Sequence, residues 1–150
     1  MRWMLAFIHL LALPIGFAAV LARARALRGA PDRAALCRAF EADTWWGIAA
    51  LLWIGTGTLR AFGGFEKGVP YYMHNLAFAM KMVLLVAILA LEVAPMLALI
   101  RWRIAARRDR AFLPGTADGL SRISYLQAAL VIAMVALATA LARGFGANAF

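Results

Sequence analysis

Four long apolar stretches constrain this chain more than any other feature. They cover residues 3–22, 44–59, 76–100 and 123–142. Hydrophobic side chains make up 65% of the 150 residues and charged ones only 15%, whereas charged residues are about a quarter of a soluble domain. A helix crosses the hydrocarbon core of a bilayer with about 20 residues. The sequence therefore predicts an all-α, integral membrane four-helix bundle that forms a single domain over residues 1–150.

The second apolar stretch is too short to cross a bilayer unless its helix begins earlier, at Ala42. With that extension, spans are predicted near residues 3–22, 42–60, 74–100 and 121–143. Trp45 and Trp46 then lie at a span end, as expected of an aromatic belt. Small residues predict a packing face on the second span, since they let helix backbones approach closely. They are Gly47, Ala50 and Gly57.

The distribution of basic residues orients the predicted spans. Eleven of the 16 Lys and Arg side chains fall in two connections, between spans one and two and between spans three and four. They are Arg23, Arg25, Arg28, Arg33, Arg38, Arg101, Arg103, Arg107, Arg108, Arg110 and Arg122. Four basic residues lie near the termini or between spans two and three, on the opposite side of the membrane. They are Arg2, Arg60, Lys67 and Arg143. Because cytoplasmic loops carry an excess of Lys and Arg, both termini are predicted to be periplasmic in a bacterial inner membrane.

The formal net charge of +9 is accounted for by these two connections. We expect them to contact anionic lipid heads at the cytoplasmic face of the bilayer, and we expect no nucleic-acid partner.

A charged residue, Lys81, lies inside the third apolar stretch, where insertion of a charge costs about 2.5–3.5 kcal/mol. At 3.6 residues per turn, His74, Lys81 and Glu92 fall within about 20° of one another on a helix. His74 joins this face if the helix begins at Pro70, and it does not if Asn75 caps the helix. We expect Glu92 to face the bundle interior, because a lipid-exposed carboxylate is costly.

A second polar residue in an apolar span, His9, lies at a depth similar to that of Lys81, about 10 Å below the outer edge. The sequence predicts that the two side chains approach each other in the outer half of the bundle. They form either an interhelical hydrogen bond worth about 1 kcal/mol or a cofactor or ion site. The candidate cofactor-binding residues are His9, Lys81, His74, Arg60 and Glu92, with His9 as the candidate metal ligand. The sequence assigns no catalytic residue.

A series of short motifs covers roughly residues 9–103. It comprises His9, Asp43 with Gly47, Thr56-Gly57, Leu59-Arg60, Glu66-Lys67-Gly68, Tyr71-Tyr72, His74-Asn75, Phe78 with Lys81, Leu91-Glu92, Pro95-Met96 and Arg101-Trp102-Arg103. With these motifs the chain resembles a family of small bacterial membrane proteins of unknown function.

More distantly, the chain resembles HemJ-type protoporphyrinogen oxidases and copper-resistance-D-type membrane proteins. In HemJ-type proteins a first-helix histidine and a later lysine are the functional pair associated with haem b. His9 and Lys81 occupy the corresponding places, so the resemblance implies haem b bound at this pair.

Three functions stay open at this point. In the first, a haem-b or related redox cofactor is bound, with His9 as the axial ligand. In the second, the protein transports a solute or handles copper without catalysis, since the thioethers of Met73, Met80 and Met82 suit Cu(I). In the third, Lys81 and Glu92 relay protons or ions. A Soret band in the purified protein would distinguish the first function from the others.

Overall fold

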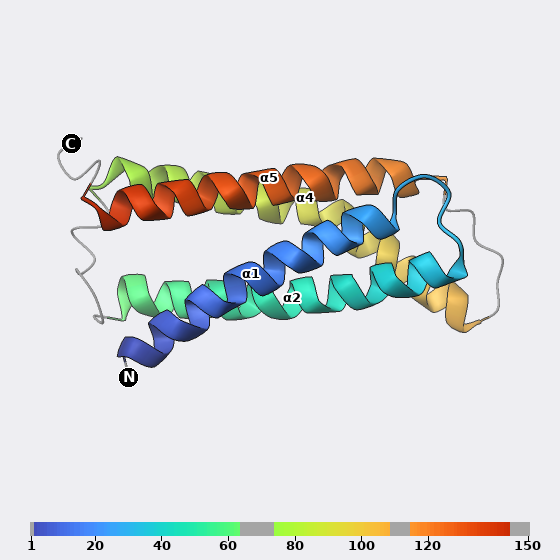
Figure 1. Cartoon of the computed structure of the whole chain (residues 1–150), viewed down its shortest axis with the longest axis horizontal. Helices are drawn as coiled ribbons and strands as arrows, with labels where there is room; N and C mark the ends of the chain where they lie inside the picture. The colour runs from blue at the N-terminus through green and yellow to red at the C-terminus, as the bar shows by residue number, and fades with distance from the viewer. Residues whose placement is uncertain (1, 64–73, 109–114, 145–150) are drawn as a thin grey trace.

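The computed structural model describes residues 2–63, 74–108 and 115–144. They form four long helices: α1 (Arg2–Ala26), α2 (Arg33–Phe62), α4 (Leu76–Arg107) and α5 (Ala117–Ala142). The helices run alternately up and down, so α1 begins and α5 ends at the same end of the bundle (Figure 1). We call this the terminal end, and we call the opposite end, where α1 leads into α2, the basic end. The all-α bundle predicted from the sequence is therefore confirmed.

Each helix extends beyond its predicted span at the basic end. The largest difference is in α2, which begins at Arg33 instead of Ala42. Asp32 caps this helix, because its carboxylate accepts a hydrogen bond from the backbone N–H of Ala35 at 2.6 Å. Gly29 makes the preceding turn possible with a φ of 75°. The segment rich in Arg and Ala after the cap has high helix propensity, and its charged side chains project outward.

The start of α4 answers the question that the sequence left open about His74. Asn75 is the N-cap, and its side chain accepts a hydrogen bond from the Phe78 N–H at 3.2 Å. His74 therefore precedes the helix and does not share the face of Lys81 and Glu92. A helix that begins at Asn75 is favoured over one that begins at Pro70, because the Asn75 side chain accepts from a backbone N–H of the first turn. That N–H has no acceptor within the helix.

The outer surface of the bundle is apolar on all four helices. Three of them, α1, α4 and α5, are long and apolar enough to cross a membrane. The same criterion of length and composition does not select α2. Its outward face is nevertheless apolar, with Trp45, Ile48, Leu51 and Leu59 all exposed, and Leu51 is 75% exposed.

Two groups of buried apolar side chains fill the interior. One, around Val20, Trp46, Ile88 and Val131, occupies the middle of the bundle. The other, around Leu27, Leu36 and Leu99, lies at the basic end. Trp46 is only 5% exposed, so its predicted place in an aromatic belt is wrong, although Trp45 next to it is exposed. The reason is the helix phase, since adjacent residues point about 100° apart.

The close contact between α1 and α2 uses Gly16 and Gly57, of which only Gly57 was expected from the sequence. A Cβ added at Gly16 would lie 3.2 Å from Ala49 Cβ, whereas one added at Gly47 would meet nothing within 4 Å. Gly47 is exposed on the outer surface, so its predicted role in packing is wrong. Gly57 does allow close approach, because a Cβ added at this position would lie 3.2 Å from the ring of His9.

We expect Gly16→Val to destabilise the protein by about 1–3 kcal/mol, because the added methyl groups overlap the Ala49 and Trp46 side chains. The matched substitution Gly47→Val adds the same atoms on the open surface and should have little effect. Unfolding of both variants in one detergent measures the difference. Equal stabilities would contradict the packing of α1 on α2 described here.

Candidate functional site

The most highly connected polar side chain in the described residues is Arg23, near the end of α1. Its side chain has no exposed surface. The guanidinium makes a bidentate pair with Glu92 of α4, with both N···O distances 2.7 Å. It also donates to Asp43 of α2 at 2.9 Å. Arg23 thus joins three helices through two carboxylates.

The fourth helix completes this arrangement. Arg23 donates to Ser124 Oγ at 3.1 Å and to Gln127 Oε1 at 2.8 Å, both on α5. All five N–H groups of the guanidinium therefore have an acceptor. The Gln127 amide donates in turn to Glu92 at 2.8 Å and to the Ile88 carbonyl at 3.2 Å. We call Arg23, Asp43, Glu92, Ser124 and Gln127 the Arg23 cluster.

A second arginine balances the charge of the Arg23 cluster. Arg103 lies 3.4 Å from the second carboxylate oxygen of Asp43, and it also donates to the Phe40 carbonyl at 2.7 Å. Two arginines therefore face two carboxylates, so the group as a whole is neutral. A buried charge is tolerated only when it is paired and hydrogen-bonded in this way.

The Arg23 cluster corrects one interpretation of the sequence and answers another. Arg23 was grouped with the basic residues that orient the protein, yet it is fully buried. Glu92 does face the bundle interior, but its partner is Arg23 and it does not line the cavity that contains His9 and Lys81. Sequence reasoning missed Arg23, Ser124 and Gln127 as members of one site. The available indication was two carboxylates, Asp43 and Glu92, in or beside apolar spans with no cation assigned to them.

A cavity of about 400 Å³ lies between the helices toward the terminal end. Its walls come from all four helices and are mainly apolar. Three of the predicted site residues line it: His9 of α1, Arg60 of α2 and Lys81 of α4. The volume falls within the range of small-molecule sites, which is about 300–1,000 Å³. The fold thus brings these three side chains to one space, whereas Glu92 lies in the Arg23 cluster and His74 lies before α4.

The imidazole of His9 is held by hydrogen bonds at both nitrogens. Trp53 Nε1 donates to His9 Nε2 at 3.0 Å, so that nitrogen is an acceptor. His9 Nδ1 lies 2.9 Å from Thr56 Oγ1, and the Thr56 hydroxyl donates to the Leu52 carbonyl at 2.6 Å. These roles are consistent with one another only if His9 is neutral and carries its proton on Nδ1.

This arrangement bears on metal or haem ligation by His9. An axial or metal ligand must offer a nitrogen lone pair, and the Nε2 lone pair is already shared with the Trp53 indole. His9 therefore does not fit the role of ligand as it is held here, unless Trp53 moves. Within the described ranges, no three His, Cys, Asp or Glu side chains gather as a metal-binding group.

The methionines expected to serve copper are distributed differently from the prediction. Met82 lines the cavity, Met80 is 49% exposed on the outer surface, and Met73 lies outside the described residues. Met134 of α5 also lines the cavity.

Comparison with known proteins identifies the family. A family model described as "Predicted membrane protein (DUF2214)" matches residues 1–146. The chain belongs to this family. It is therefore a membrane protein, and the resemblance to a family of uncharacterised membrane proteins is confirmed. No curated protein and no solved structure matches the chain. The resemblance of this DUF2214 protein to HemJ-type oxidases and copper-resistance-D-type proteins stays a prediction.

We expect Arg23→Gln to destabilise the protein by about 3–5 kcal/mol, because it leaves the Glu92 carboxylate buried without its cation. The double variant Arg23→Gln/Glu92→Gln should recover part of this loss, since it removes the unpaired Glu92 carboxylate and leaves Asp43 beside Arg103. Arg25→Gln is the matched control, because it removes the same charge from an exposed position on the same helix. Thermal unfolding in detergent measures the stability of all three variants. Equal losses at positions 23 and 25 would show that the Arg23 cluster does not hold the helices together.

Proposed function

We propose that this protein is a four-span protein of the bacterial inner membrane that binds a small, largely apolar molecule in the cavity near its terminal end. One observation carries the proposal: a cavity of about 400 Å³ that is mainly apolar and is also lined by His9, Lys81 and Arg60. Sites for small molecules commonly combine apolar walls with a few polar groups that set the orientation of the ligand.

The cost of burying polar groups supports this proposal. A lysine within an apolar span costs free energy, and such residues commonly mark functional sites in membrane proteins. His9 is kept in one tautomer and one orientation by Thr56 and Trp53. A histidine fixed in this way is preorganised, so a ligand packing against it meets a defined surface.

The geometry supports haem-b binding less well than it supports binding of a small, largely apolar molecule. Haem ligation by His9 would require the bond between Trp53 and His9 Nε2 to break. We therefore propose a ligand held by packing, hydrogen bonds and charge in preference to an iron-bound one.

The relay prediction also has less support than ligand binding. Lys81 and Glu92 are about 16 Å apart along α4. The apolar group that contains Val20, Ile88 and Val131 occupies the middle of the bundle, and Glu92 is engaged by Arg23. A proton path between the two residues would have to cross apolar side chains.

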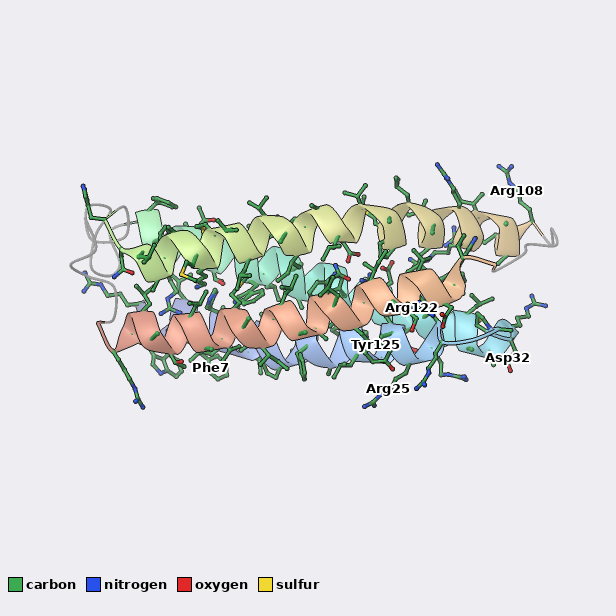
Figure 2. The ribbon with its side chains drawn as sticks, turned by 90° about the horizontal axis from the view of Figure 1, so that it is seen from above. Phe7, Arg25, Asp32, Arg108, Arg122 and Tyr125 are labelled. Atoms are coloured by element: carbon green, nitrogen blue, oxygen red, sulfur yellow. The ribbon has the colours of Figure 1, made fainter. Side chains whose placement is uncertain are left out.

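The spans and their orientation are part of the proposal. The exposed apolar face of α2, with Ile48, Leu51 and Leu59, supports its role as the fourth span. The end of α1, the start of α2, the end of α4 and the start of α5 lie at one end of the bundle (Figure 1), and these helix ends carry most of the basic residues. There, the side chains of Arg25 and Arg108 project outward (Figure 2), where they can meet water and lipid heads. We assign this end to the cytoplasm and the terminal end to the periplasm.

A reporter fused after Phe150 tests the orientation. Alkaline phosphatase, which matures in the periplasm, should be active there, and a fluorescent protein that matures only in the cytoplasm should stay dark. Fusions within residues 109–114 should give the opposite pattern. An active cytoplasmic reporter after Phe150 would overturn the orientation.

Ligand binding can be tested through Trp53, which lines the cavity. We expect ω-bromododecanol, a neutral chain with a quenching bromine at its end, to quench Trp53 fluorescence in lipid nanodiscs. The quenching measured in the wild type minus that measured in Trp53→Phe gives the quenching of Trp53 alone, without that of the other tryptophans.

Ala138→Phe should abolish the quenching of Trp53, because the phenylalanine ring would fill the cavity from α5 and exclude the probe. Ala133→Phe is the matched control, since Ala133 is exposed on the outside of the same helix. If Trp53 is quenched equally strongly in both variants, the brominated probe reaches it from the bilayer and not from the cavity. That result would reject the proposed function.

A further inference from the structure

Two exposed arginines at the basic end differ from those that hold the bundle together. Arg23 and Arg103 are both engaged inside the protein, by the Arg23 cluster and by the Phe40 carbonyl. Arg25 of α1 and Arg38 of α2 are exposed, and neither forms a hydrogen bond or an ion pair within the described residues. Their guanidinium groups can therefore bind a molecule outside the protein.

Carboxylates do not pair with Arg25 or Arg38 in the part of the chain that the structure describes. Asp118 is paired with Arg122 at 3.1 Å, and Asp32 caps α2. Glu41 is exposed on α2, yet it forms no ion pair within the described ranges. The surface around the two arginines therefore keeps a positive charge that an anionic partner can balance.

The Arg23 cluster shows how far the two arginines lie along the bundle. Arg23 is hydrogen-bonded to Asp43 of α2 and to Ser124 of α5, so these three residues share one level. At 1.5 Å per residue, Arg25 lies about 3 Å beyond this level toward the basic end, and Arg38 about 8 Å beyond it. The two arginines are thus within about one helical turn of each other in height.

Exposed aromatic side chains lie just inside this height, toward the middle of the bundle. Trp45 of α2 is 51% exposed and Tyr125 of α5 is 36% exposed, each within about 3 Å of the level of the Arg23 cluster. Figure 2 shows Tyr125 and Arg25 close together along the long axis of the bundle. Trp and Tyr side chains concentrate where the hydrocarbon of a bilayer meets its head groups. Arg25 and Arg38 therefore lie at the height of the lipid head groups.

We propose that Arg25 and Arg38 bind the head group of an anionic phospholipid, whose acyl chains lie beside Trp45. Arginine donates paired N–H groups to phosphate oxygens, which suits this head group. A membrane lipid is favoured over an acidic soluble protein, because the two arginines lie next to the aromatic side chains that mark the bilayer surface. The inference goes beyond the proposed function and does not involve the cavity.

Quenching of Trp45 by brominated lipid tests the proposal. The protein is placed in nanodiscs of equal parts phosphatidylglycerol and phosphatidylcholine, with bromine on the acyl chains of one lipid or of the other. Both preparations have the same composition and charge, so they differ only in which lipid quenches. The quenching in the wild type minus that in Trp45→Phe gives the quenching of Trp45 alone. We expect phosphatidylglycerol to be enriched beside Trp45 by at least about fivefold, the factor that one arginine near an anionic surface supplies.

Substitutions assign this enrichment to the two arginines. Arg25→Gln/Arg38→Gln should reduce it to about one, whereas Arg25→Lys/Arg38→Lys should retain most of it and keeps the test decisive if the first variant does not fold. Arg2→Gln/Arg143→Gln is the matched control, because it removes the same charge from exposed positions at the terminal end. Both leaflets of the nanodisc have the same composition, so the direction of insertion does not affect the result.

Two results would overturn the inference. Equal quenching of Trp45 by the two brominated lipids in the wild type would leave these arginines to orient the protein or to meet an acidic soluble partner. An enrichment that persists unchanged in Arg25→Gln/Arg38→Gln would show that the anionic lipid is bound by other residues. Neither result bears on the cavity, so the proposed function stands or fails separately.

Discussion

The bidentate ion pair between Arg23 and Glu92 is the interaction on which the rest of this bundle depends. Helices in a membrane gain little from the hydrophobic effect when they associate, because lipid chains are as apolar as leucine side chains. Polar contacts and close packing must therefore determine which helix faces which. Arg23 reaches one acceptor or more on each of the other three helices, and every N–H of its guanidinium is used. Together, these bonds constrain the rotation and the axial position of each helix relative to the others.

The Arg23 cluster has consequences for the two ends of the bundle. Toward the basic end, Leu27, Leu36 and Leu99 pack closely beside it. Toward the terminal end, the four helices leave a space of about 400 Å³ that His9, Lys81 and Arg60 line. Since the Arg23 cluster holds the helices together some distance away, the terminal half does not need to close on itself. We infer that the stability of the fold and the properties of the cavity are supplied by different residues.

Polar residues in the spans thus fall into two groups with different chemistry. The Arg23 cluster together with Arg103 pairs two arginines with two carboxylates, and every N–H of the Arg23 guanidinium is hydrogen-bonded, which is what a structural role requires. The cavity places His9, Lys81 and Arg60 beside mainly apolar walls and an open volume of about 400 Å³. The Arg23 cluster leaves no open volume between its groups, whereas the cavity does, and this is the physical reason for assigning ligand binding to the cavity.

The sequence by itself determined the fold class and the approximate extent of the helices, because apolar length is a property of the chain alone. The cost of intramembrane charge also singled out candidate site residues, of which His9, Lys81 and Arg60 line the cavity whereas Glu92 and His74 do not. It also placed Glu92 inward. It could not determine that Arg23 is the partner of Glu92, since the two are far apart in the chain and a basic residue at a span end is also what topology requires. The capping of α4 by Asn75, the burial of Trp46 and the contact of Gly16 with Ala49 were likewise decided by the tertiary structure. Each depends on helix phase and on which neighbour a face meets, and these follow from packing between helices.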